Sequence, residues 1–296
     1  MDILSYLMGY KAGESAGGGS GGGSGGGDLP AGIYLTVPDE PAPCTYRYQR
    51  FKYNGELYAG ANGGSGAGAL RAIYKWNGSK WDTVVDSTTL NTVVGTSMDG
   101  VNFYVAEYNG KAYIAYSKKC FVFDGSTFES VADFPSSYYR VVSYNGKLYG
   151  CPSTSGSWCE WDDASSTWIS TDSALTVKAY GAFVLNNALY YHNGTSLYKY
   201  ENGSQTKVLT SPASGFFTFN GNIYTYTDSS SQPNKCWRLN LETGESIYVG
   251  DLPPATSTTY RWFSANIDET SFGLISYSSN NFCPYFVIRS IVEPTA

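Results

Sequence analysis

Aromatic side chains next to arginine are the residues of this chain best suited to binding a ligand. The candidates are Tyr46, Arg47, Tyr104, Tyr139, Arg140, Tyr180, Phe216, Tyr260, Arg261 and Trp262. Aromatic rings stack against sugars, and arginine holds carboxylates through paired hydrogen bonds. The same residues could instead fill a central channel and pair with main-chain carbonyl groups. The sequence therefore leaves two interpretations open, a ligand site and a packed channel.

Catalytic groups are harder to find. His192 is the single histidine and lies in Tyr191-His192-Asn193-Gly194, which is typical of a hairpin tip. A serine or cysteine nucleophile would therefore have no recognisable base. Neither a phosphate-binding loop nor a calcium loop is found. We expect a protein that is not an enzyme and that uses no cofactor.

A repeat defines the elements that would position these residues. An aromatic or apolar residue, Asn-Gly or a variant of it, and then an apolar-Tyr pair recur at Asn54, Asn109, Asn145, Asn186 and Asn220, with a degenerate copy at Asp268. Successive copies lie 34 to 55 residues apart. Asn-Gly between apolar runs is a strong hairpin signal, because a type I′ turn needs positive φ at both central residues.

A second hairpin lies between the copies, as in Tyr74–Trp81 and Phe121–Phe128. Two hairpins in each of six repeats of about 43 residues predict an all-β fold, a six-bladed β-propeller of four-stranded blades. The pattern resembles the Kelch-type β-propeller over nearly all of residues 32–292. Residues 32–37 match the fourth strand near residues 246–250, so we expect them to supply the outer strand of the last blade and close the ring.

Six cysteines raise the question of a metal site or of disulfides. When the third strands of the repeats are aligned, one position holds Ile73, Cys120, Cys159, Leu197, Cys236 and Cys283. A position shared by isoleucine, leucine and cysteine is typical of an apolar core, where free cysteine behaves as a hydrophobic residue. We expect no metal site, and whether Cys151 and Cys159 form a disulfide stays open.

Loop length distinguishes the two faces of the predicted propeller. Connections within hairpins are tight, whereas those from the second to the third strand and from one blade to the next are longer, as in residues 60–70, 86–101 and 227–235. Long loops on a rigid scaffold commonly carry binding. The arginine and aromatic residues begin the innermost strands on this same face, so we expect the ligand there.

The first 27 residues differ in composition from the rest of the chain. Ile3, Leu4, Leu7 and Met8 form one apolar stripe at helical spacing, and a Gly/Ser-rich linker follows over residues 13–27. A helix this short is marginal alone, so we expect it to dock into a larger assembly. A frayed terminus and a fusion-derived linker are the alternatives. The predicted domains are an anchor peptide (1–12), a linker (13–27) and the propeller (28–296).

The opening MDILSYLMGYKAG with its Gly/Ser run resembles the start of bacteriophage virion proteins, in which a short apolar peptide plugs into the particle and a glycine tether displays a distal domain. The resemblance implies a virion structural protein, a head or tail fibre or adhesin. Its partners would be other virion proteins, through the N-terminal segment, and a host-surface glycan or protein. The sequence shows no signal peptide, so we expect assembly in the host cytoplasm and location in the virion.

Charge and hydropathy argue against a nucleic-acid-binding protein and against a membrane-spanning one. A net charge of −6 with scattered Lys and Arg gives no basic patch for nucleic acid, and no run of 18 apolar residues could span a membrane. Arg47, Arg140 and Arg261 invite comparison with sialidases, propeller enzymes that hold a carboxylate with three arginines. A carbohydrate-active enzyme of the sialidase or sugar-epimerase type is therefore the alternative function, and an intracellular Kelch-type scaffold is the second alternative.

Overall fold

The computed structural model describes residues 31–293 except 37–39, 44–47, 62–71, 96–103, 137–138, 154–156, 172–173, 194, 211–214, 228–233, 253–259, 265–270 and 277–284. At residues 36, 234, 260–264, 271–276 and 285–286 it describes the backbone alone. The expected anchor (1–12) with Ile3, Leu4, Leu7 and Met8, the linker (13–27), and the candidate ligand residues Tyr46 and Arg47 lie outside the described residues.

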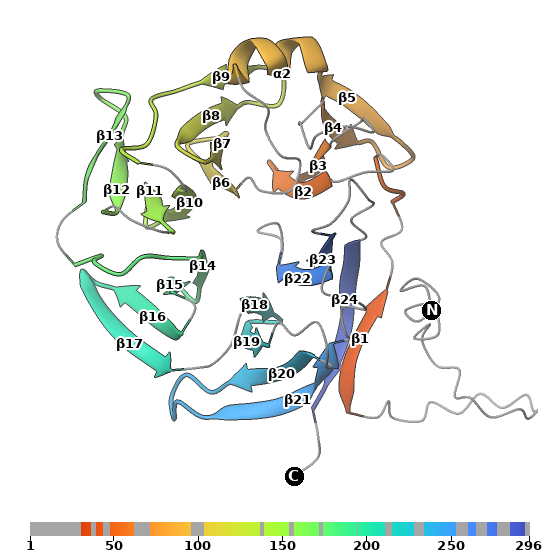
Figure 1. Ribbon diagram of the computed structural model, residues 1–296, viewed down its shortest axis with the longest axis vertical. Helices are drawn as coiled ribbons and strands as arrows, with labels where there is room; N and C mark the ends of the chain where they lie inside the picture. Colours follow the sequence, from red (N-terminus) through yellow and green to blue (C-terminus); the bar gives the residue numbers. More distant parts are fainter. Residues whose placement is uncertain are drawn as a thin grey trace, which may run out of the picture.

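The described chain is an all-β propeller of four-stranded blades with one helix. Five sheets follow the chain in order, each with antiparallel neighbouring strands. They are β2–β5 (Tyr48–Tyr53, Glu56–Ala61, Ala72–Trp76, Trp81–Val85), β6–β9 (Tyr104–Tyr108, Lys111–Tyr116, Lys119–Phe123, Phe128–Ser130), β10–β13 (Tyr139–Tyr144, Lys147–Pro152, Cys159–Asp162, Thr167–Ser170), β14–β17 (Gly181–Leu185, Ala188–His192, Ser196–Glu201, Ser204–Thr210) and β18–β21 (Gly215–Phe219, Asn222–Tyr226, Asn234–Leu239, Ser246–Leu252). The sheets surround a common centre, and the first strand of each lies nearest to it (Figure 1).

The remaining sheet combines the two ends of the described chain. It contains β22 (Tyr260–Ser264), β23 (Ser271–Ser276), β24 (Tyr285–Val292) and β1 (Gly32–Thr36), with β1 paired antiparallel to β24 and Gly32 opposite Val292. Ile33 of β1 and Ile288 of β24 belong to one buried cluster with side chains of the preceding sheet, among them Cys236 and Val249. Figure 1 shows β1 and β24 side by side next to β21.

The Asn-Gly copies form the predicted tight hairpins. Asn54 and Gly55, between β2 and β3, have φ angles of 51° and 74°. Positive φ at both central residues is the type I′ condition, which asparagine and glycine meet at little steric cost. The same pairs of positive φ occur at Asn109-Gly110, Asn145-Gly146, Asn186-Asn187 and Asn220-Gly221. The hairpin prediction is therefore confirmed at these five turns.

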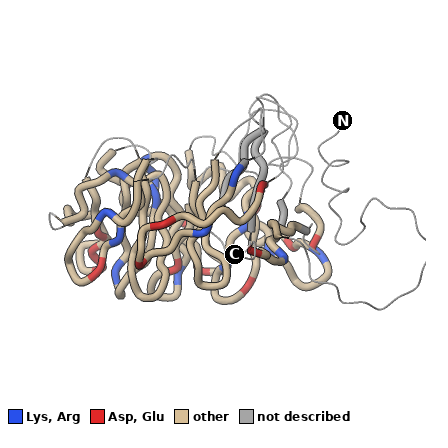
Figure 2. Tube along the Cα trace, turned by 90° about the horizontal axis from the view of Figure 1, so that it is seen from below, with Lys and Arg blue, Asp and Glu red and all other residues tan. Residues whose placement is uncertain are grey.

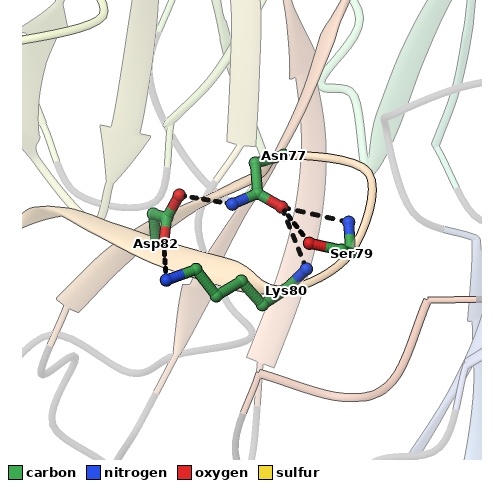
Figure 3. Close-up of polar contacts among 4 residues, drawn as sticks. All are labelled: Asn77, Ser79, Lys80 and Asp82. Carbon is green, nitrogen blue, oxygen red and sulfur yellow. Dashed lines mark hydrogen bonds and ion pairs between the residues drawn. The ribbon is translucent and has the colours of Figure 1, made fainter.

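Four of the five described turns between third and fourth strands are held by a side chain instead; the fifth, at Asn202-Gly203, has φ angles of 50° and 76° like the Asn-Gly hairpins. Figure 3 shows Asn77 after β4, whose Oδ1 accepts hydrogen bonds from the backbone N–H groups of Ser79 and Lys80, both at 3.0 Å. Its Nδ2 donates to Asp82 at 2.6 Å, and Asp82 also pairs with Lys80 at 3.3 Å. Side-chain oxygens brace the equivalent turns in the same way at Asp124, Asp162 and Asn240. This local bonding explains why each of these four turns begins with Asn or Asp.

The core lies mainly between neighbouring sheets. Phe51, Tyr58 and Ile73 of the first sheet pack in one buried cluster with Ile114 and Phe121 of the second. The shared third-strand position is buried wherever its side chain is described, at 0–1% exposure for Ile73, Cys120, Cys159, Leu197 and Cys236. The interpretation of this position as apolar core is confirmed for those five residues.

Tyrosine hydroxyl groups link successive sheets at the Asn-Gly hairpins. Tyr53 donates to the Gly110 carbonyl at 2.6 Å, and Tyr108 donates to Asp163 at 2.8 Å. Tyr144 donates to the Asn187 carbonyl at 3.4 Å. The tyrosine that precedes each of these Asn-Gly pairs thus reaches the next sheet along the chain.

A short helix replaces part of the expected irregular connection over residues 86–101. Helix α2 (Ser87–Val94) begins after Asp86, whose carboxylate accepts from Thr89 N at 2.8 Å, and ends at Gly95 with φ of 65°. Leu90 and Val94, four residues apart, are its buried side chains, at 1% and 5% exposure, and join the cluster between the first two sheets. The expectation of an irregular loop is therefore wrong for this stretch.

Charged residues are interspersed around the described part of the molecule. In Figure 2 segments with Lys or Arg and segments with Asp or Glu are both spread over the described trace. Among the described residues, no helix has the length and apolar character that crossing a membrane would require.

Candidate ligand-binding site

The starts of the innermost strands bring several of the candidate residues into one region. Tyr104 is the first residue of β6, Arg140 the second residue of β10, and Tyr180 directly precedes β14. Strand β10 lies against both β6 and β14, so these residues from three successive sheets are neighbours. His192 lies in the same region, because it pairs with Gly181 across β14 and β15. We call Tyr104, Arg140, Tyr180 and His192 the Arg140 site.

Arg140 is the half-buried cation of this site. Its guanidinium carbon lies 4.4 Å from the centre of the Tyr104 ring, and Nη1 donates to the Ala179 carbonyl at 3.3 Å. Nε is buried and has no hydrogen-bond partner. No carboxylate among the described residues forms an ion pair with Arg140. The guanidinium is therefore held in place on two sides while part of its donor capacity is unused.

His192 is buried beside Arg140, with 8% of its surface exposed. Its ring centre lies 4.8 Å from Phe216 and 6.5 Å from Tyr180. Burial, and to a lesser extent the positive charge of Arg140, lowers the pKa of His192 to about 3, so the imidazole is neutral at pH 7. Its Nδ1 is buried and has no hydrogen-bond partner. Arg140 and His192 thus each present an unsatisfied buried nitrogen.

The position of His192 beside Arg140 was not expected from the sequence. The prediction that His192 lies at a hairpin tip is wrong, because His192 is the last residue of β15 and is buried. A Cβ atom on Gly181 would lie 2.7 Å from His192 Nε2, so the missing side chain at Gly181 leaves room for the imidazole. The repeat contained a signal that His192 is buried. Leu189-Tyr190-Tyr191-His192 aligns with Leu148-Tyr149-Gly150-Cys151. Cys151 is fully buried and lies opposite Arg140 in the strand register.

The other candidate ligand residues divide into exposed and core positions. Tyr180 is 39% exposed, and its hydroxyl accepts a hydrogen bond from Lys178 Nζ at 3.1 Å. Tyr139 is 1% exposed, stacks on Phe134 and donates to the Ser157 carbonyl at 2.7 Å. Phe216 is 4% exposed. Tyr139 and Phe216 are therefore core residues rather than direct ligand contacts.

Strand β22 carries the three remaining candidates, Tyr260, Arg261 and Trp262. Only the backbone is described there. Arg261 holds the second position of β22, as Arg140 does in β10, and β22 lies beside β18.

A separate surface pocket lies between β17 and the turn after β20. Its volume is about 640 Å³, and Lys199, Glu201, Lys207, Leu241 and Glu242 are among its lining residues. Lys199 and Glu201 form an ion pair at 2.7 Å, so these opposite charges satisfy each other. The sequence analysis did not single out this pocket. It lacks the unsatisfied buried groups that distinguish the Arg140 site.

The described cysteines are poor candidates for nucleophiles. Cys120, Cys151, Cys159 and Cys236 are all free and buried, so Cys151 and Cys159 do not form a disulfide. Burial raises the pKa of each thiol, to about 12 for Cys151, which keeps the sulfur protonated near neutral pH. Within the described ranges, no cluster of three or more His, Cys, Asp or Glu could hold a metal ion.

Sequence comparison gives no relatives: no protein-family model matches this chain, and no curated protein matches it. Solved structures do resemble it. Virginiamycin B lyase from Staphylococcus aureus is 13% identical, with a TM-score of 0.50 over 86% of this chain and 89% of that chain. YjhT is 12% identical, with a TM-score of 0.48 over 85% of this chain and 95% of that chain.

The extracellular domain of the putative one component system BT4673 from B. thetaiotaomicron is 9% identical, with a TM-score of 0.48 over 80% of this chain. This chain spans 32% of that protein's length. At such low identity the likeness concerns the fold and not the activity. The chain is therefore a β-propeller protein, and its own residues have to carry any functional conclusion.

Proposed function

We propose that this protein is a non-enzymatic binding protein of a virion surface, a head or tail fibre or adhesin, whose propeller presents the Arg140 site to a host-surface glycan. The observation that carries the proposal is the guanidinium of Arg140, held 4.4 Å from the Tyr104 ring and bonded to the carbonyl of Ala179, which directly precedes the exposed Tyr180. An aromatic ring supplies a stacking surface for a sugar, and a fixed guanidinium supplies hydrogen-bond donors for its oxygens.

In this proposal the six four-stranded sheets are the blades of one Kelch-like ring, which β1 closes by completing the last blade. The pairing of β1 with β24 supports this, as does the burial of Ile33 in a cluster with side chains of β18–β21. A closed ring holds the inner strands in fixed positions. Its loops can then vary without disturbing the scaffold.

Residues 1–12 are the attachment segment in this proposal. Ile3, Leu4, Leu7 and Met8 form the apolar stripe that docks into the particle, and residues 13–27 act as a flexible tether. The support for this part is the sequence pattern alone. In this proposal the propeller lies at the virion surface, away from its point of attachment.

A glycan array followed by calorimetry on the glycans that bind tests the proposed binding. We expect Tyr180→Ala to weaken glycan binding about tenfold, because the exposed ring would lose its stacking contact. Tyr248→Ala is the matched control, since Tyr248 is 43% exposed on the distant outer strand β21. A propeller that binds no glycan, or that converts the bound glycan to product, would refute the proposal, and so would an equal loss in the control.

A further inference from the structure

Arg140 is a cation without a counter-ion in a protein whose net charge is −6. Most charged groups that lose water on folding gain an opposite charge in return, since an unpaired half-buried charge costs free energy. Here Tyr104 covers one face of the guanidinium and the Ala179 carbonyl accepts from Nη1. Neither partner is anionic, so the positive charge is positioned but not neutralised by the described residues.

Two buried nitrogen atoms at this site, Nε of Arg140 and Nδ1 of His192, have no hydrogen-bond partner in the part of the chain that the structure describes. Buried polar groups are almost always paired, and an exception calls for an explanation, such as an absent ligand or water. Because His192 is neutral at pH 7, it adds no second positive charge and supplies no negative charge to balance Arg140. Arg140 Nε–H lacks a hydrogen-bond acceptor, and beside a guanidinium the best acceptor is an anion. The neutral imidazole donates or accepts at Nδ1 according to its tautomer.

A second described charge near this site is also positive. Lys178 Nζ lies 5.0 Å above the centre of the Tyr180 ring and bonds to its hydroxyl, which adds a second positive charge. The exposed Tyr180 has Lys178 and His192 as neighbours and directly follows Ala179, which accepts from Arg140, so it offers an aromatic surface in the same region as the guanidinium.

We propose that the ligand of the Arg140 site is an acidic glycan, whose carboxylate accepts hydrogen bonds from Arg140 while its sugar ring lies against Tyr180. This inference rests on the proposed function as a glycan-binding propeller and adds the charge of the glycan. A planar carboxylate matches the fork of N–H groups on guanidinium. A neutral glycan could accept hydrogen bonds from Arg140 but would leave its positive charge without a counter-ion.

The test compares acidic glycans ending in sialic or uronic acid with their methyl esters, which keep the same sugar skeleton but lose the charge. On wild-type protein we expect the free acid to bind at least tenfold more tightly than the ester, as measured by calorimetry or surface plasmon resonance. This comparison needs no variant, so it does not depend on how a substitution folds. Equal binding of acid and ester would overturn the inference while leaving the proposed function standing.

Substitutions then assign the effect to Arg140. Arg140→Gln should remove the preference for the acid over the ester, and Arg140→Lys should retain only part of it, because lysine keeps the charge but not the planar fork. Arg289→Gln is the matched control, since Arg289 is an exposed arginine on β24, and thermal unfolding checks that each variant is folded. A preference that persists in folded Arg140→Gln would contradict the inference.

A peptide with a free C-terminal carboxylate serves as the second probe. If it binds through Arg140 while no glycan binds, both the acidic-glycan assignment and the proposed glycan function are wrong. If neither probe binds, the proposed function fails and the inference fails with it. Binding of neutral glycans alone would refute only the assignment of charge.

Discussion

At the residue scale, His192 has a measurable effect on stability whatever the protein binds. Its pKa is about 3 in the folded chain, against an ordinary value of 6.5. Between these values the unfolded chain binds a proton that the folded chain does not, so the free energy of unfolding falls as the pH is lowered. From pH 7 to pH 4.5 this single group should cost on the order of 2 kcal/mol.

Replacing His192 by phenylalanine should remove that part of the pH dependence, because no group at this position would then titrate. Urea unfolding of both proteins at pH 7 and pH 4.5 measures the effect. The acidic residues that also titrate in this range are the same in both proteins, so the difference isolates His192. Equal losses of stability in the two proteins would contradict the lowered pKa.

The sequence could predict some residues of the site and not others, for a physical reason. Arg140 and Tyr180 could be chosen as candidates because each lies at or next to the start of a repeated strand. Tyr139 and Phe216 have the same residue types and nearly the same register, but their rings are buried in the core at 1% and 4% exposure. Local sequence shows where a strand starts, whereas the direction of a side chain depends on which neighbouring sheet it meets.

At the element scale, the turns could be predicted because they depend on residues that are close together in the chain. The Asn-Gly turns satisfy a backbone requirement within two residues, so they could be read directly from the chain. Helix α2 was missed because threonine, valine and asparagine, which make up much of Ser87–Val94, favour helix only weakly. Its signals were Asp86 before it, Gly95 after it, and Leu90 and Val94 four residues apart.

Tyrosine bridges between sheets provide a prediction at this scale. Tyr108→Phe should lower the free energy of unfolding by about 1 kcal/mol, because it removes the hydroxyl that donates to Asp163 at 2.8 Å and keeps the buried ring. Tyr198→Phe is the control, since the Tyr198 ring stacks on Tyr191 and its hydroxyl has no hydrogen bond to a described residue. Chemical denaturation of both variants measures the difference. A loss of the same size in both would show that the bridge between sheets adds nothing.

At the scale of the whole molecule, β1 links the two ends of the propeller. A Cβ atom on Gly250 of β21 would lie 3.0 Å from Gly32 Cα, so the backbones of β21 and β1 approach closely. Ile33, at 7% exposure, packs with Ile288 and Val249. Neither end of the ring can therefore be removed without exposing apolar surface of the other.

Two truncations separate the attachment of the propeller from its closure. Deleting residues 2–27 should leave its melting temperature unchanged, because the proposed tether contributes no packed surface, but should abolish incorporation into particles. Deleting residues 2–37 should in addition destabilise the fold by at least about 2 kcal/mol from the lost burial of Ile33 alone, and should expose the edge of β24.

Thermal unfolding and the amount of protein recovered in purified particles distinguish the two effects. If the shorter deletion is incorporated normally, residues 1–12 are not the anchor, whatever the propeller binds. If the longer deletion melts at the same temperature as the shorter one, β1 does not close the ring. The proposed glycan site lies on β6, β10 and β14, and the shorter deletion keeps every strand of the propeller, so it should retain glycan binding in full.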